Sequence, residues 1–274
     1  MWLSQLRNLI RSPRRTRRPA PKLHRRGRLL LEQLEDRSLP STYYAATVSD
    51  LIADINAANQ AGGSNTVLLA ANTTFDLAAA NNGTNGGNGL PVIAANNNLA
   101  IIGQGGDVIQ RDPFSYYDFR LFDVAGGASL TLTDLILQNG HVSGAVSGNS
   151  TADGGAIYNQ GTVVLNAVTV QNNVVYGGFY DPSPAGGGIW STGALTLENG
   201  TSVQGNRVAG DLGTNKRGGD AFGGGLYIAG GTAYLTGAAV TNNSAVGGDG
   251  AEMICGDFCF YPTGPGGDGF GGGL

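Results

Sequence analysis

The side chains that could carry out chemistry are few, and four of them stand in one short stretch. Arg111, Asp118, Arg120 and Asp123 combine carboxylates with basic groups. Carboxylates that hold Ca²⁺ beside a basic residue that removes a proton are the equipment of a polysaccharide lyase. Two Asp residues two positions apart on one strand would favour a metal or glycosidase site, but Asp118 and Asp123 are spaced more widely than that. We therefore expect solvated loop charges, with carbohydrate chemistry as the alternative.

A second set of acidic residues lies in the glycine-rich part of the chain near its C-terminus. Gly-Asp-Gly occurs around Asp249 and again around Asp268, and Asp220 also follows a glycine. These segments are similar to calcium-binding glycine-rich repeats, although the tandem period of such repeats is absent. We expect flexible turns here, with calcium ligation as the alternative and no other cofactor.

The two cysteines, Cys255 and Cys259, lie in the same glycine-rich region. In an exported protein we expect them to form a disulfide that closes this small loop, with two free thiols as the alternative. A metal site would need two further ligands, and no histidine is near. Because His24 and His141 are the only histidines, a Ser-His-Asp or Cys-His arrangement is not expected, and His141 is predicted to be an exposed loop residue.

These residues must be positioned by a repeated unit. Glycine-rich blocks that end in an aliphatic residue occur four times: Gly154-Gly155-Ala156-Ile157, Gly186-Gly187-Gly188-Ile189, Gly223-Gly224-Gly225-Leu226 and Gly271-Gly272-Gly273-Leu274. The first three are followed by a β-type run and then Val-x-x-Asn, which ends at Asn173, Asn206 and Asn243. The final aliphatic residues are 32, 37 and 48 positions apart, and such uneven spacing favours stacked coils with variable loops over a barrel.

Alternating apolar residues predict short strands with an inward-facing row. The row reads Leu130, Leu132, Leu135, Leu137, then Val163, Leu165, Val168, Val170, then Leu195, Leu197, Val203, and finally Ala233, Leu235, Val240. A spacing of two puts side chains on one face of a strand, and coils stacked about 4.8 Å apart bury them. Residues 90–93, 99–103 and 119–124 are predicted strands of earlier coils. The sequence thus predicts an all-β, single-stranded parallel β-helix of about six coils over residues 65–274.

Glycine and asparagine have structural roles in this prediction. The glycines allow tight corners and close backbone approach, at Gly154, Gly155, Gly187, Gly188, Gly224 and Gly225. Asn173, Asn206 and Asn243 occupy one place in successive coils, with Gly140 in the equivalent place before them. Asn tolerates left-handed backbone, and identical amides can form a ladder along the stack.

The Gly-Gly-Ala-Ile block followed by Val-x-x-Asn resembles the repeat of polymorphic outer membrane proteins, which carry Phe where this chain has Val170, Val203 and Val240. The resemblance covers residues 127–274. It implies a right-handed parallel β-helix of the pectate-lyase type, displayed outside the cell and active in adhesion.

The first 41 residues form a separate basic leader. Residues 1–40 carry ten Arg and Lys22 against three acidic residues, a net charge of +8, whereas the rest of the chain carries −12. The segment 28–41, with its Leu-Glu-x-Leu-Glu-x-Arg-x-Leu core, resembles a leader motif of planctomycete bacteria, which implies export. We expect this leader to be disordered and able to contact anionic membrane; nucleic-acid binding is not expected, because no basic surface continues it in the body.

Residues 42–64 are predicted to form a helical cap. Thr47 and Asp50 fit a capping box, and Val48, Leu51, Ile52, Ile55 and Ala58 follow at helical spacing, with an end near Gly62. A stack of coils needs such a unit because its terminal strand edges and apolar interior would otherwise be open.

These features predict a secreted or cell-surface (outer-membrane) β-helix that is not an enzyme and acts as an adhesin or structural element. Its partner would be an extracellular glycan or surface protein, and a C-terminal continuation of the β-helix is expected. Binding would use the loops 141–153, 176–185, 208–222 and 247–270. The candidate contact residues are aromatic: Tyr176, Phe179, Tyr180, Trp190, Phe258, Phe260 and Tyr261. The alternatives are a polysaccharide lyase or hydrolase and a calcium-stiffened surface scaffold.

Overall fold

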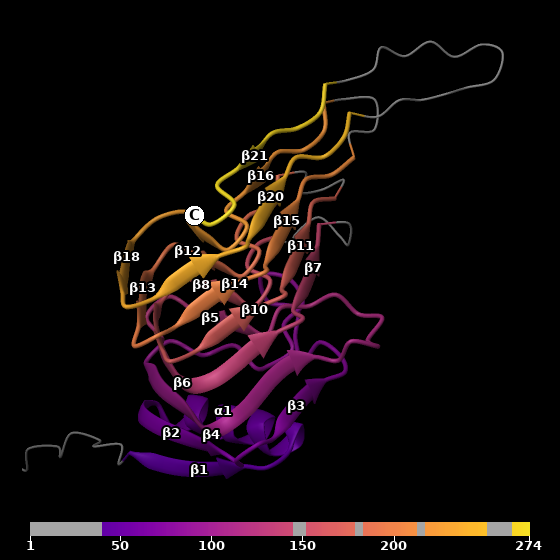
Figure 1. Ribbon diagram of the computed structural model, residues 1–274. Coiled ribbons are helices and arrows are strands. Elements are labelled where there is room, and N and C mark those ends of the chain that lie inside the picture. Colours follow the sequence, from indigo (N-terminus) through magenta and orange to yellow (C-terminus); the bar gives the residue numbers. More distant parts are fainter. Residues whose placement is uncertain (1–39, 145–151, 179–182, 213–216, 251–264) are drawn as a thin grey trace, which may run out of the picture. The chain divides into compact units, whose positions relative to one another are not determined.

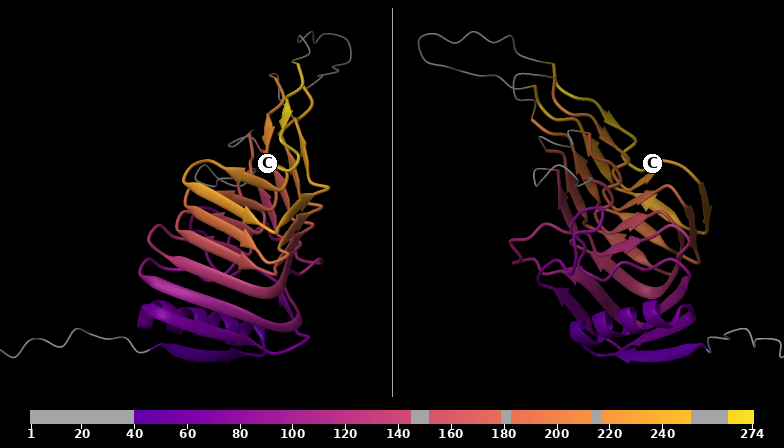
Figure 2. Two further views of the ribbon diagram at one scale, coloured as in Figure 1. Left: turned by 60° about the vertical axis from the view of Figure 1, so that its left-hand side comes forward. Right: turned by 180° about the vertical axis from the view of Figure 1, so that it is seen from behind.

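The computed structural model describes residues 40–144, 152–178, 183–212, 217–250 and 265–274, all within one compact unit, Ser38–Leu274. The basic leader, both cysteines and the aromatic residues Phe179, Tyr180, Phe258, Phe260 and Tyr261 lie outside these ranges. Nearly all described strand pairs are parallel, and they form a β-solenoid of about five turns, close to the six predicted. Figures 1 and 2 show the coils stacked in sequence order, from indigo to yellow.

The largest sheet, here the long sheet, has eleven strands. They are β1 (Ser41–Ala45), β2 (Gly63–Leu69), β3 (Thr74–Leu77), β4 (Asn97–Arg111), β6 (Ser129–Gln138), β9 (Thr162–Asn166), β10 (Thr169–Gln171), β13 (Ala194–Glu198), β14 (Ser202–Gln204), β18 (Thr232–Thr236) and β19 (Ala239–Thr241). Successive coils lie side by side in it, in the order β1-β2-β4-β6-β10-β14-β19.

Three smaller sheets complete the coils. The β5 sheet holds β5 (Phe122–Val124), β8 (Ile157–Asn159), β12 (Ile189–Ser191) and β17 (Leu226–Ile228). The β7 sheet holds β7 (His141–Ser143), β11 (Val174–Tyr176), β15 (Arg207–Ala209) and β20 (Ser244–Val246). A two-stranded sheet pairs β16 (Ala221–Phe222) with β21 (Gly269–Phe270).

The predicted register between coils is confirmed. Leu130 pairs with Val163, and Val163 with Leu195, which in turn pairs with Ala233. Leu137, Val170, Val203 and Val240 form a second such row. In the earlier coils these side chains are fully buried, namely Leu130, Leu137, Val163, Val170, Leu195 and Val203. The apolar rows therefore line the interior of the stack, as their spacing of two predicts.

The N-terminal end of the stack is covered by α1 (Val48–Ala61). Its capping box is formed as predicted: Thr47 Oγ1 accepts from the Asp50 backbone N–H, and the Asp50 carboxylate accepts from the Thr47 N–H. Leu51, Ile55 and Ala58 are buried in the core, and the helix ends at Gly62. Within the described ranges no helix has the length and apolar character that crossing a membrane requires.

Two segments differ from the sequence prediction. Residues 41–45 form β1, which adds a parallel strand beside β2 within the region expected to be only a helical cap. The strand predicted over residues 90–93 is not formed; Ile93 makes an isolated bridge to Val124. Pro91 has no N–H to donate, and this weakens a ladder of parallel hydrogen bonds at that point.

The predicted asparagine ladder is formed inside one corner of the stack. The Asn206 Oδ1 accepts from the Asn173 backbone N–H at 3.0 Å and from the Asn173 Nδ2 at 2.9 Å. Asn243 binds Asn206 in the same way, and Asn173 Oδ1 accepts from the Gly140 N–H at 2.8 Å. The ladder residues are not the left-handed ones, contrary to the prediction. That conformation belongs to the residue before each, namely Asn139, Asn172, Gly205 and Asn242.

The glycine blocks allow the backbone of one coil to touch the next. Gly154, Gly186, Gly223 and Gly271 have φ between +56° and +65°. At Gly187 a Cβ would lie 2.2 Å from the Gly224 carbonyl oxygen and 2.7 Å from the Arg207 carbonyl oxygen. Real Cβ atoms do not approach backbone so closely, and backbone cannot move away as a flexible side chain can.

We predict that Asn206→Ala lowers the free energy of unfolding by about 2–4 kcal/mol. The change leaves the buried backbone N–H of Asn173 without an acceptor, at a cost of about 1–3 kcal/mol, and it also removes one of the acceptors of the Asn173 side-chain amide. Urea denaturation followed by circular dichroism measures the effect. The control is Asn98→Ala, which removes an exposed amide from the outer face of β4 and should change stability little. Equal losses in both variants would contradict the ladder's role.

We also predict that Gly187→Ala destabilises the protein by more than the usual cost of overpacking, which is about 1–3 kcal/mol. The reason is that the added methyl group meets carbonyl groups of two neighbouring segments. Gly83→Ala is the matched control, since a Cβ there meets nothing within 4 Å. Thermal unfolding of the two variants distinguishes them, and a Gly187→Ala protein as stable as Gly83→Ala would refute the close-contact explanation.

Candidate functional site

Of the four residues that the sequence offers as candidates for carbohydrate chemistry, Arg120 and Asp123 are buried. The Arg120 side chain is fully buried, and its Nη1 donates to the Asn85 carbonyl at 2.8 Å and to Asn88 Oδ1 at 3.2 Å. Its Nε donates to the Asp153 carbonyl at 3.2 Å, and its Cζ lies 4.9 Å from the Tyr158 ring centroid. Burial lowers the pKa of Arg120, and the nearby Asp123 opposes that shift. Arg120 joins neighbouring coils and has no exposed surface for a substrate.

Asp123 is buried in the same region, on β5. Its Oδ2 accepts from Asn85 Nδ2 at 3.1 Å, whereas its Oδ1 has no hydrogen-bond partner among the described residues. Burial raises the pKa of Asp123, and Arg120 partly offsets the shift. In register with it, on β8 and β12, Tyr158 and Trp190 stack with ring centroids 4.3 Å apart. Trp190 thus lies on a strand rather than on a loop, and one face of its ring is covered.

Arg111 ends β4 and holds an exposed turn, residues 112–117, here called the aromatic loop. The Arg111 Nε donates to the Tyr117 carbonyl at 2.8 Å and its Nη2 to the Ser115 carbonyl at 2.6 Å. Phe114 is 87% exposed, Tyr116 99% and Tyr117 63%. Exposing a large aromatic side chain to water is unfavourable in free energy. Three of them together on one turn therefore indicate a contact surface.

Hydrogen bonds fix the backbone of the aromatic loop. Asp112 Oδ1 accepts from the Phe114 N–H at 2.8 Å, and the Asp112 carbonyl accepts from the Ser115 N–H at 2.9 Å. Ser115 Oγ donates to the Ala78 carbonyl at 2.8 Å, which ties the turn to the chain after β3. The loop is therefore preorganised, and binding through its aromatic rings would cost little ordering of the backbone. In Figure 1 the magenta chain between β4 and β5 projects from the side of the stack.

Beside the aromatic loop, Asp118 and three side chains on the outer face of the β7 sheet form a line of contacts, here called the charged row. Asp118 Oδ1 lies 2.6 Å from His141 Nδ1. The His141 ring centroid is 5.4 Å from that of Tyr176, and Arg207 Cζ is 5.9 Å from the Tyr176 ring. Asp118 and Tyr176 were named from the sequence. His141, expected on a loop, is instead part of β7.

The Asp118–His141 contact fixes the orientation of the imidazole. The hydrogen bond from His141 is the main cause that lowers the pKa of Asp118, so its carboxylate is ionised at neutral pH. An ionised carboxylate can only accept, so Nδ1 carries a proton and Nε2 is the nitrogen left for another partner. The His141 and Asp118 side chains are 29% and 31% exposed, so solvent and ligands reach this pair.

The candidate calcium ligands lie in a different place and have a basic partner. Arg217 Nη1 donates to Asp220 Oδ2 at 2.9 Å, and its Nη2 lies 2.5 Å from Asp268 Oδ2. Asp220 precedes β16 and Asp268 precedes β21, and the pairing of these two strands brings the carboxylates together. The guanidinium of Arg217 is the cation between them. Asp249 does not join them: within the described ranges no three His, Cys, Asp or Glu side chains form a group suited to a metal ion.

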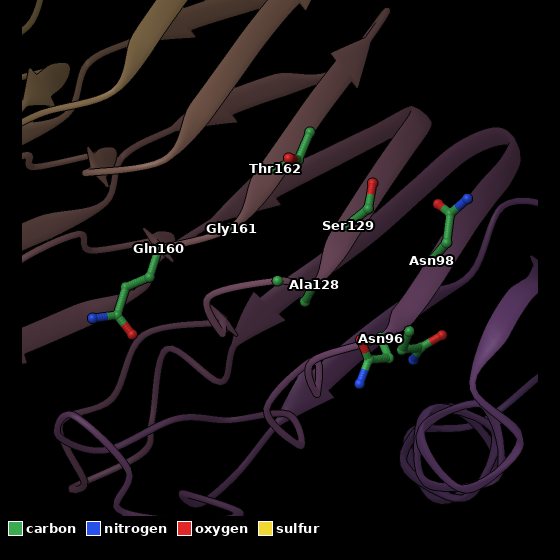
Figure 3. Close-up of a pocket in the computed structure, with 9 residues that line it drawn as sticks. Asn96, Asn98, Ala128, Ser129, Gln160, Gly161 and Thr162 are labelled. Carbon is green, nitrogen blue, oxygen red and sulfur yellow. The ribbon is translucent and has the colours of Figure 1, made fainter.

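A shallow polar groove of about 430 Å³ runs across the coils where the β5 sheet turns into the long sheet. Figure 3 shows Asn98, Ser129 and Thr162 projecting from neighbouring strands, with Gln160 across from them. Its lining is Asn96, Asn97, Asn98, Gly127, Ala128, Ser129, Gln160, Gly161 and Thr162. With neither charged nor aromatic side chains in this lining, the groove offers only neutral hydrogen-bonding groups.

Sequence reasoning missed the aromatic loop and the partners of Asp118. The aromatic loop had a readable signal: Phe114, Tyr116 and Tyr117 follow Pro113 in a segment that lacks the alternation of a strand. Aromatic residues in such a segment are candidates for surface contacts. The charged row had no such signal, because its members come from segments up to 89 positions apart and meet only through stacking.

We predict that Asp118→Asn lowers stability at neutral pH and that this loss shrinks in acid. The folded pKa of Asp118 is below its ordinary value of 3.8. The contact with His141 therefore stabilises fully above about pH 4 and loses its effect as pH falls through the lowered folded pKa. Urea midpoints at pH 7, 5, 3 and 2 give the difference from wild type. Asp134→Asn, at an exposed carboxylate, should show no such trend; a difference that stays constant to pH 2 for Asp118→Asn would contradict the prediction.

The chain matches no protein-family model, no curated protein and no solved structure. The resemblances to polymorphic outer membrane proteins and to a planctomycete leader therefore rest on the sequence motifs alone.

Proposed function

We propose that this protein is a non-catalytic β-helix, secreted or displayed at the cell surface, that recognises an extracellular glycan or surface protein. Recognition would use the aromatic loop together with the charged row, here called the recognition face. The observation that carries the proposal is the exposure of Phe114, Tyr116 and Tyr117 on a turn whose backbone is held by hydrogen bonds. Rigid aromatic side chains supply much contact area at low entropic cost, and tyrosine is typical of protein surfaces evolved for binding.

The regular scaffold is consistent with such a role. Coils that are locked in register give the loops between them fixed positions, and binding residues are often found on loops carried by rigid scaffolds. Adhesion and export are supported only by the Gly-Gly-Ala-Ile repeat and by the leader motif of residues 28–41. Localisation outside the cell is thus part of the proposal.

A polysaccharide lyase is the second candidate, and the Asp118–His141 pair favours it. A carboxylate that orients an imidazole leaves Nε2 as a base able to remove a proton, and Arg207 lies in the same row. Arg120 and Asp123, the buried candidates, do not serve this reaction because a polymer cannot reach them. A calcium-stiffened scaffold is less favoured, since Ca²⁺ would have to displace Arg217 from Asp220 and Asp268.

The decisive test is binding of the full chain to glycan arrays and to intact cells. We expect the double substitution Phe114→Ser, Tyr116→Ser to weaken binding at least about tenfold, because exposed aromatic anchors often dominate an interface. Tyr234→Ser is the matched control, since Tyr234 is 63% exposed on the outer face of β18, away from the recognition face.

Unchanged binding by the aromatic-loop variant would refute the proposed role of the loop. The same preparations should be incubated with acidic polysaccharides while the absorbance of unsaturated products is recorded. Product formation that is lost in His141→Gln would establish the lyase and replace the non-catalytic proposal.

A further inference from the structure

We propose that the charged row selects acidic saccharides, with Arg207 binding the carboxylate or sulfate group of the ligand. This inference rests on the recognition function proposed above and names the chemical class of its ligand. It is carried by the state of the four described arginines, by the geometry of the row and by the charge of the whole body.

Arg207 differs from the other described arginines because its guanidinium donates to none of the residues that the structure describes. Arg111 donates to two carbonyl groups of the aromatic loop, and Arg217 is paired with two aspartates. Arg120 is buried among hydrogen-bond acceptors. Arg207 is exposed, makes no ion pair with a described carboxylate, and has its guanidinium carbon 5.9 Å from the centroid of the Tyr176 ring. A guanidinium presents five N–H donors in a fixed fork that matches a carboxylate or sulfate.

The parallel register places a second polar group at a suitable distance. His141 pairs with Val174, and Val174 pairs with Arg207, so the first and last begin strands two apart in the β7 sheet. Strand spacing puts their backbones about 10 Å apart, with the Tyr176 side chain lying between them. A sugar ring placed across Tyr176 would have its acidic group at Arg207 and its hydroxyl groups toward His141.

Asp118 makes His141 suitable for a hydroxyl group. Because Nδ1 is held by the carboxylate, Nε2 is left as an acceptor when the imidazole is neutral. The negative charge of Asp118 lies at the far end of the row, against His141 Nδ1, so the guanidinium of Arg207 is the positive group that an acidic ligand would contact. Asp118 is a positioning residue in this arrangement, and Arg207 and His141 are the contacts.

The negative charge of the body separates local recognition of an acidic ligand from general electrostatic attraction. Residues 41–274 carry a net charge of −12, so the protein as a whole repels anions. A preference for an acidic ligand over its neutral counterpart cannot arise from general attraction and has to come from a local group such as Arg207.

The experiment compares one saccharide with and without its charge, using the full chain and isothermal titration calorimetry. The probes are tetragalacturonate, its methyl ester, and a sulfated galactan tetrasaccharide beside the unsulfated one. We expect at least one acidic form to bind tenfold or more tightly than its neutral partner. The pair that shows the difference identifies carboxylate or sulfate as the recognised group.

The variants assign the preference to the row. Arg207→Gln should abolish the difference between acidic and neutral forms, and Arg207→Lys should keep part of it, because lysine retains the charge without the fork. Arg217→Gln removes the same charge from a guanidinium that is already paired with Asp220 and Asp268, and it should leave the preference intact. Circular dichroism confirms that each variant is folded.

Three results would overturn the inference. Equal affinity of wild type for the acidic and neutral forms would do so while leaving recognition by the aromatic loop in place. An equal loss in Arg207→Gln and Arg217→Gln would show that overall charge, not the row, sets affinity. No saccharide binding, together with cell binding that depends on Phe114 and Tyr116, would indicate a protein partner; if that dependence is also missing, the proposed function itself fails.

Discussion

The structure depends on parallel pairing of each coil with the one before it. In a parallel ladder every residue of a coil has a fixed partner in the next, so side chains of one kind line up along the stack. Leu132, Leu165, Leu197 and Leu235 form such a line on the inside. No single coil can bury its inward row; stacking buries Leu132, Leu165 and Leu197 fully, whereas Leu235 in the last of these coils is 39% exposed. Register is therefore both the result of the repeat and the condition for its stability.

The same constraint explains why glycine and asparagine recur. Where coils turn sharply, their backbones come within contact distance, and only a residue without a Cβ fits. Where the corner has room, Asn173, Asn206 and Asn243 use their amides to satisfy backbone N–H groups that the turn leaves without partners. A second ladder runs on the outer surface, through Gln110, Gln138, Gln171 and Gln204. These ladders tie neighbouring coils together in addition to the strand hydrogen bonds.

A stack built in this way separates buried charge from available charge. Arg120 and Arg207 are identical in chemistry, yet the first is enclosed by acceptors and the second faces solvent. Asp118 and Asp123 differ likewise: a hydrogen bond from His141 lowers the pKa of the first, and burial raises that of the second. Chemistry or recognition is therefore confined to the outer faces and loops. On these surfaces the aromatic loop and the charged row adjoin, since Asp118 directly follows Tyr117.

The sequence alone determined the repeated unit, its register and its cap. These features are local patterns: the glycine blocks, the spacing of two in the apolar rows and the Val-x-x-Asn element. Each lies within a short stretch of sequence and can be recognised without knowledge of the fold. The capping box of α1 was readable for the same reason. What the sequence could not determine was which charged residues are buried and which meet. Arg111, Asp118, Arg120 and Asp123 look equivalent along the chain, and only the folding of each coil onto its neighbours decides their surroundings. His141, Tyr176 and Arg207 become neighbours because β7, β11 and β15 stack in register, and contacts between coils exist only once the coils have formed.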